Sequence, residues 1–129
     1  MRGLADFADS ELPKLLEQGG IEVMVLFVPA LGAEEKHVVP AMRFLQADSV
    51  HYYWSRDREV MALFGRSIGH EVDLYDFWAI YDEGSRWVEE PPMPSFWQHQ
   101  MVGLPEGKRL DVQEFSDQLS VLSVNEEED

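Results

Sequence analysis

Apolar residues in the first part of the chain recur at helical spacing. Over residues 4–18 they fall three or four positions apart, which predicts a helix with one apolar face. Pro13 is best tolerated in a first helical turn, so the main part of this helix is expected to begin at Asp9 or Ser10. The pair Gly19 and Gly20 supplies its end.

Two short runs rich in β-branched and aromatic residues predict strands. Residues 21–28 are almost wholly apolar and are bounded by glycine and proline, a pattern typical of a strand buried on both faces. Residues 50–54 (Val-His-Tyr-Tyr-Trp) predict a second strand. Between them a helix is expected over about 33–46, with a kink at Pro40.

The next segments predict a helix and a hairpin. Ser55 is a suitable N-cap for a helix that Gly69 would end. Residues 74–81 predict a third strand, and residues 86–89 are expected to return as its antiparallel edge partner.

The remaining sequence predicts a long connection and a closing helix. Residues 90–110 show no regular pattern, and such long connections are often functional. Asp111 and Glu114 form a capping-box-like start for a last helix, whose inner face would consist of Val112, Phe115, Leu119 and Leu122.

The element order is therefore α-β-α-β-α-β-β-α, an α/β fold with a central mixed sheet flanked by helices. A length of 129 residues suits one domain. We expect a single domain over residues 1–124, followed by an acidic tail over residues 125–129.

This order resembles the thioredoxin fold without its first strand, over roughly residues 5–122. In that family the first core strand leads into a Cys-x-x-Cys motif, a lysine and a helix kinked by proline. With Pro40 as the kink, the lysine would be Lys36, and the motif would fall on residues 32–35, from Gly32 to Glu35. The family's cis-proline region corresponds to residues 70–74, which contain no proline.

The chain departs from the family at the positions that carry its chemistry. It contains no cysteine, so no thiolate is present for dithiol–disulfide exchange. The resemblance therefore implies a divergent, redox-inactive member. Thioredoxin-like proteins without these cysteines include accessory proteins and chaperones, but a fold alone does not fix a function.

Charge narrows the classes of partner. The formal net charge is −15, and residues 67–129 carry fifteen Asp and Glu against three Lys and Arg. Nucleic acids and anionic membrane surfaces are therefore disfavoured as partners. The acidity favours solubility first; docking of a basic partner and adaptation to high salt are the alternatives.

One segment has the composition of a recognition surface. Residues 90–105 combine prolines with aromatic and methionine side chains, which suits protein binding. The candidate partner-binding residues are Pro92, Met93, Pro94, Phe96, Trp97, His99 and Met101. The alternative is that Phe96, Trp97 and Met101 fold back to cover the edge strand at 86–89.

The leading hypothesis is a non-enzymatic, cytoplasmic protein-interaction or accessory module of chaperone type. It would bind a protein partner or a second copy of itself. A basic partner would complement the acidic charge of the chain. No cofactor, no metal and no catalytic residue are expected. The alternative is a small-molecule- or metal-binding domain, enzymes included, that uses His70, Asp73 and His99.

Overall fold

The structure is a computed structural model that describes residues 2–30, 36 and 38–127. It is a mixed α/β fold with two small sheets. In chain order the elements are α1 (Arg2–Ala8), α2 (Leu12–Glu17), β1 (Val23–Phe27), α3 (Val38–Ala41), the 3₁₀ turn η2 (Met42–Phe44), β2 (Val50–Trp54), α4 (Glu59–Ser67), β3 (Phe77–Ile80), β4 (Phe96–His99), the 3₁₀ turn η3 (Glu106–Lys108) and α5 (Val112–Glu127).

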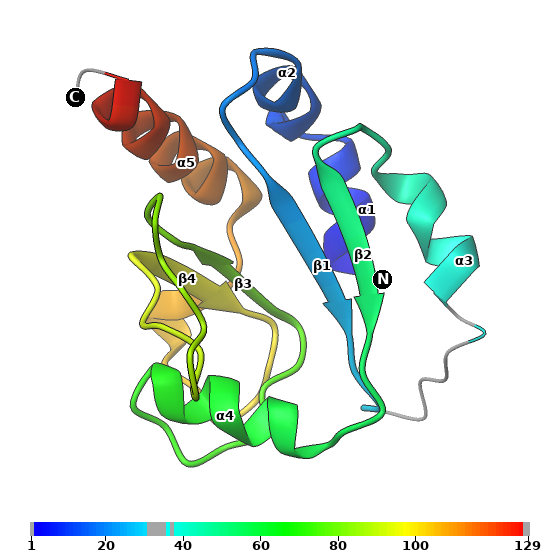
Figure 1. The fold of residues 1–129 in the computed structure, drawn as a ribbon, viewed down its shortest axis with the longest axis vertical. Coiled ribbons are helices and arrows are strands. Elements are labelled where there is room, and N and C mark those ends of the chain that lie inside the picture. Colours follow the sequence, from blue (N-terminus) through cyan, green and yellow to red (C-terminus); the bar gives the residue numbers. More distant parts are fainter. Residues whose placement is uncertain (1, 31–35, 37, 128–129) are drawn as a thin grey trace.

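Strands β1 and β2 form a parallel pair, as a βαβ unit requires. The register places Val23 beside Val50 and Phe27 beside Trp54. Both strands occur where the sequence predicts them. The expectation that the first strand is buried on both faces is wrong, however, because Met24 is 73% exposed. Figure 1 shows α1 behind this pair of strands and α2 near their upper ends.

Strands β3 and β4 form a separate antiparallel sheet, so the expected single central sheet is divided in two. The predicted edge strand at residues 86–89 is wrong, since the partner of β3 is residues 96–99. Those residues lie in the segment predicted to be an irregular connection. Their burial on both faces explains the error, because it removes the apolar–polar alternation that identifies a strand.

The predicted helices occur with changed ends. The first divides into α1 and α2, because the Ser10 hydroxyl accepts the Leu12 N–H at 3.1 Å and donates to the Phe7 carbonyl. The expected cap Ser55 lies ahead of α4, which begins at Glu59. Asp57, and not Ser55, accepts the N–H of Glu59 at 2.9 Å. Pro40 lies inside α3, which passes directly into η2.

The last helix starts as predicted and is longer than predicted. Asp111 accepts the N–H of Glu114 at 3.0 Å, which is the expected cap. The predicted inner face packs in the core: Phe115 is buried, and Val112, Leu119 and Leu122 are partly buried against the same cluster. Because α5 extends to Glu127, most of the predicted acidic tail is helical. No helix of the described residues is long and apolar enough to span a bilayer.

Two apolar clusters lie on opposite faces of the β3–β4 sheet. The first cluster joins α1, α2, η2 and α5 with Ile80, Trp78 and Phe96. The second joins the end of α4 with Phe77, Ala79 and Trp97. Side chains alternate along a strand, so those on one face of β3 and β4 pack into the first cluster and those on the other face pack into the second. This sheet is therefore the layer between two cores.

The close approach of α4 to the following segment provides a test of this arrangement. A Cβ at Gly65 would overlap the backbone oxygen of Val72, which would have to move. We expect Gly65→Ala to lower the free energy of unfolding by about 1–3 kcal/mol in urea denaturation. Gly107→Ala is the matched control, since a Cβ there meets nothing within 4 Å, and its stability should change by less than about 1 kcal/mol. Equal stability of the two variants would contradict this packing.

Candidate functional site

The most distinctive surface feature is the loop that joins β3 to β4, residues 82–95, called here the 82–95 loop. Its base is closed by two hydrogen bonds: the Ser95 N–H donates to the Ile80 carbonyl at 2.8 Å, and the Ser95 hydroxyl donates to Asp82 Oδ1 at 2.7 Å. Gly84, with a φ of +86°, makes the tight turn that follows Asp82. The two ends of the loop are therefore held together.

The middle of the loop is fastened to α4. Trp87 packs edge-on against Phe64, with ring centroids 5.2 Å apart. Glu90 lies 3.6 Å from the Arg66 guanidinium, an exposed ion pair that contributes at most about 1 kcal/mol. Figure 1 shows the loop descending toward α4. The ring contact, more than the ion pair, holds the loop in place.

Two prolines help to keep the loop in one conformation while two apolar side chains point into solvent. Pro91 and Pro94 are buried, and their fixed φ angles limit the conformations of the loop. Val88 is 84% exposed and Met93 is 75% exposed. These two apolar side chains therefore lie in solvent on a loop that is held at its base and at Trp87.

Most of the predicted partner-binding residues lie in the core. Trp97, His99, Met101 and Pro94 are buried, while Phe96 and Pro92 are partly buried. Of the seven, Met93 alone is exposed. The expectation of an exposed surface over residues 92–101 is therefore corrected: strand β4 and the turn after it pack inward. Between residues 82 and 101 the exposed large apolar side chains, Trp87, Val88 and Met93, lie in the loop that precedes this strand.

His99 has a structural environment. Its side chain is 0% exposed, Nδ1 accepts the Met101 N–H at 3.0 Å, and Nε2 donates to the Pro105 carbonyl at 2.8 Å. This pair of bonds requires the neutral ring with its hydrogen on Nε2. Both nitrogens are occupied, so a metal would have to displace a buried backbone partner.

The other members of the alternative site do not join His99. The ring of His70 lies edge-on to Trp97 at 6.1 Å, and Asp73 is exposed. Across residues 2–30, 36 and 38–127, no three His, Asp or Glu side chains form a group that could hold a metal ion. The structure therefore does not assemble a ligand set from His70, Asp73 and His99.

The position that corresponds to the thioredoxin-family motif is only partly described. Gly32 and Glu35 lie outside the described residues, and Lys36 is exposed. At residues 70–74, which correspond to the family's cis-proline region, all peptide bonds are trans. The interpretation of this loop as a vestigial motif therefore stays a prediction.

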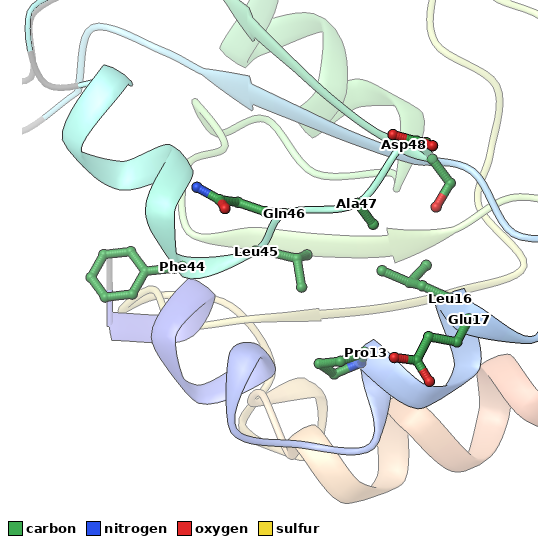
Figure 2. A pocket seen from close by; sticks show the side chains of 9 residues that line it. Pro13, Leu16, Glu17, Phe44, Leu45, Gln46, Ala47 and Asp48 are labelled. Atoms are coloured by element: carbon green, nitrogen blue, oxygen red, sulfur yellow. The ribbon is translucent and has the colours of Figure 1, made fainter.

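A shallow groove lies on the opposite part of the fold (Figure 2). It has a volume of about 470 Å³ and lies between α2 and residues 44–49. Leu16 and Leu45 form an apolar floor, and Glu17 and Asp48 supply exposed carboxylates. These two carboxylates are the ionisable side chains of the lining, which combines them with an apolar floor.

Comparison with known proteins gives no relative. No protein-family model, no curated protein and no solved structure matches the chain. The candidate site therefore rests on the geometry of this chain alone.

Sequence reasoning missed Trp87 and Val88, because it assigned them to a strand. No decisive signal was present: four carboxylates and three prolines lie near them between residues 82 and 94, a composition that suits an edge strand as well as an irregular loop.

Tyr81, at the base of the loop, predicts a change in stability at alkaline pH. Burial raises the pKa of its phenol to about 12. A pKa above the unfolded value of about 10 means that its contribution to stability is complete below pH 10 and falls as the pH rises toward 12. The hydroxyl has no hydrogen-bond partner among the described residues. Tyr81→Phe should therefore fold at least as stably at pH 8 and lose less stability between pH 9 and 11, measured by urea unfolding. An identical pH dependence in both proteins would contradict the burial of this hydroxyl.

The buried contacts of His99 predict a structural role. His99→Leu leaves the Met101 N–H and the Pro105 carbonyl without their partner, so unfolding free energy should fall by about 2 kcal/mol or more. His51→Leu is the control, because its contact with Glu22 is exposed and its loss should cost less than about 1 kcal/mol. Urea denaturation of both variants measures the difference. A His99→Leu protein of unchanged stability would contradict this structural role.

Proposed function

We propose that this chain is a non-enzymatic protein-interaction module of accessory or chaperone type, and that the 82–95 loop binds its partner. The observation that carries the proposal is the pair of exposed side chains, Val88 and Met93, on a loop that is tied at its base and pinned to α4. A pre-ordered loop loses little conformational entropy when it binds, which favours affinity.

Charge supports a basic protein as the partner. The loop carries Asp82, Glu83, Glu89 and Glu90 against the single cation Arg86, within a chain of net charge −15. Carboxylates around an apolar contact raise the rate of encounter with a basic surface and disfavour acidic ones. The loop therefore combines an apolar centre with an acidic surround, the arrangement of a small recognition patch.

The resemblance to redox-inactive thioredoxin-like proteins agrees with this proposal. A parallel strand pair, an antiparallel strand pair and a closing helix follow one another along the chain, although the strands form two sheets and not the single central sheet that the resemblance implies. The absence of cysteine from the sequence removes thiol chemistry from such a fold. What the fold then offers is a scaffold that presents a loop, and a cytoplasmic accessory protein is the setting that we propose for it.

Affinity capture from the source organism's lysate tests the proposal. The double variant Val88→Ser/Met93→Ser should lose a stoichiometric partner that the unchanged protein retains, because the apolar contact is removed. Val102→Ser is the matched control, since Val102 is 91% exposed but lies outside the loop. All three proteins should melt within a few degrees of one another, because none of these side chains is buried.

The salt dependence of capture separates the contribution of the carboxylates from that of the apolar side chains. Raising the salt concentration from about 0.1 M to about 1 M shortens the screening length from about 10 Å to about 3 Å. A basic partner should be retained less well at high salt. A partner that both the double variant and the control retain equally would show that the loop is not the binding site.

A further inference from the structure

Strand β2 has an edge with no neighbouring strand. It belongs to a two-stranded sheet whose other member is β1, and no third strand among the described residues joins them. Figure 1 shows β1 on the side of the β3–β4 sheet and β2 on the far side. The outer edge of β2 is thus a place where a further strand can pair.

The hydrogen bonds at the two ends of the pair fix which residues of β2 bond to β1. The Val23 N–H donates to the Ser49 carbonyl at 2.8 Å, and the Ser55 N–H donates to the Phe27 carbonyl at 3.0 Å. Bonded and unbonded residues alternate along a strand of a parallel pair. Every second residue from 49 to 55 therefore bonds to β1, and the residues between them direct their backbone groups to the outer edge.

The outward groups are those of Val50, Tyr52 and Trp54. The Val50 N–H already donates to the Ala47 carbonyl at 3.1 Å. No backbone hydrogen bond to a described residue involves the Val50 carbonyl, the Tyr52 N–H and carbonyl, or the Trp54 N–H. Two donors and two acceptors are therefore unpaired along one short edge.

The sequence of β2 has none of the features that prevent pairing at an edge. Natural edge strands are protected by lysine, by proline or by a β-bulge. Residues 50–54 (Val-His-Tyr-Tyr-Trp) contain no lysine, no acidic residue and no proline, and their register with β1 is regular. Their β-branched and aromatic side chains favour extended backbone, so this strand is suited to a position between two others.

The chain that precedes β2 leaves space beside this edge. A shallow hollow of about 490 Å³ lies between η2 and the start of the strand. It is lined by Met42, Gln46, Ala47, Asp48, Val50 and Tyr52. An incoming strand therefore has room next to the first half of β2.

The unpaired groups are self-complementary about Tyr52. Two opposite residues of an antiparallel pair can exchange both of their backbone hydrogen bonds. A two-fold axis at Tyr52 places it opposite the partner's Tyr52, which makes two bonds. The same axis places each Trp54 N–H opposite the unpaired Val50 carbonyl of the other copy, which makes two more. All four groups then have a partner, and the Trp54 carbonyl alone is left to water.

Local charge permits two copies to approach at this edge. Residues 46–58 contain two acidic and two basic residues, whereas residues 67–129 carry fifteen Asp and Glu against three Lys and Arg. At about 0.15 M salt the screening length is about 8 Å, so charges far from the edge contribute little. Antiparallel pairing also brings the end of β2 that carries Asp48 beside the end of the partner strand that carries Arg56, where opposite charges attract.

We propose that two copies of this chain pair antiparallel through β2, with the two-fold axis at Tyr52, and form a four-stranded sheet in the order β1–β2–β2–β1. Two strands about 17 Å long bury little compared with the roughly 800 Å² per partner of a stable dimer. The dimer is therefore weak, with a dissociation constant on the order of 0.1–1 mM. This edge is separate from the 82–95 loop, and pairing there does not depend on whether that loop binds a partner.

Amide hydrogen exchange of ¹⁵N-labelled protein tests which backbone groups become paired. The amides of His51 and Tyr53, which bond to β1, should exchange slowly at every protein concentration. Those of Tyr52 and Trp54 should exchange fast at about 0.05 mM protein. At about 2 mM protein they should slow by about two- to fivefold, because pairing lowers the monomer fraction by that factor.

Single cysteines test the register, because the chain has no cysteine of its own. The axis at Tyr52 places His51 opposite the partner's Tyr53, with Cα atoms about 4.5 Å apart, a distance that a disulfide can bridge. A mixture of His51→Cys and Tyr53→Cys proteins should therefore form a disulfide dimer at least about fivefold faster than either variant alone, since two copies of one variant lie diagonally and too far apart. Val121→Cys, at an exposed position on α5, is the control for random collision. All three positions are exposed, so the melting temperatures should agree within a few degrees.

Four results would overturn the proposal. Fast exchange at Tyr52 and Trp54 at both concentrations would mean that no second copy pairs there. Slow exchange at both concentrations would make another segment of the same chain the occupant of the edge. Exchange that slows only in the presence of a captured partner would assign the edge to a strand of another protein. Disulfide formation by either variant alone as fast as by the mixture would exclude the axis at Tyr52.

Discussion

The burial of the β3–β4 sheet on both faces is the constraint on which the rest of the fold depends. Trp78, Ile80 and Phe96 pack into one apolar cluster, and Phe77 and Trp97 pack into the other. A strand between two cores has little tolerance for polar side chains, and those it contains must be hydrogen-bonded. Gln98 meets this requirement by accepting the N–H of Asp111 at 3.0 Å, and His99 meets it through the backbone of the turn that follows.

This burial also explains where accessible apolar surface can occur. The aromatic residues around position 97 are used to join the two clusters, and Lys108 further covers the rings of Phe96 and Trp97 at 5.5 and 5.1 Å. The loop that precedes β4 has no such role. It is held by its base and by Trp87, and its remaining apolar side chains have no core to enter. A rigid scaffold with an ordered, exposed loop is a frequent basis of recognition.

The two strand pairs differ in how their faces are covered. The antiparallel pair has a core on each face, while the parallel pair has a core on one face and Met24 and Tyr53 in solvent on the other. Burial of exposed apolar area against another surface lowers the free energy of the system. The antiparallel pair is therefore the more fully covered of the two, and exposed apolar side chains lie on the 82–95 loop, at Val88 and Met93, and on β1 and β2, at Met24 and Tyr53.

The sequence by itself determined the local elements: β1 and β2 from their β-branched runs, the caps at Asp111 and Glu114, and the apolar stripe of α5 through Phe115. These features depend on neighbours within a few residues, so spacing reveals them. Only the tertiary structure decided that residues 96–99, and not 86–89, pair with β3, because that choice depends on contacts with distant residues in α5 and at the end of α4. It likewise decided that Met24 on β1 is exposed while Val23 and Phe27 pack against the core, since a run of apolar residues does not specify how many layers will cover it.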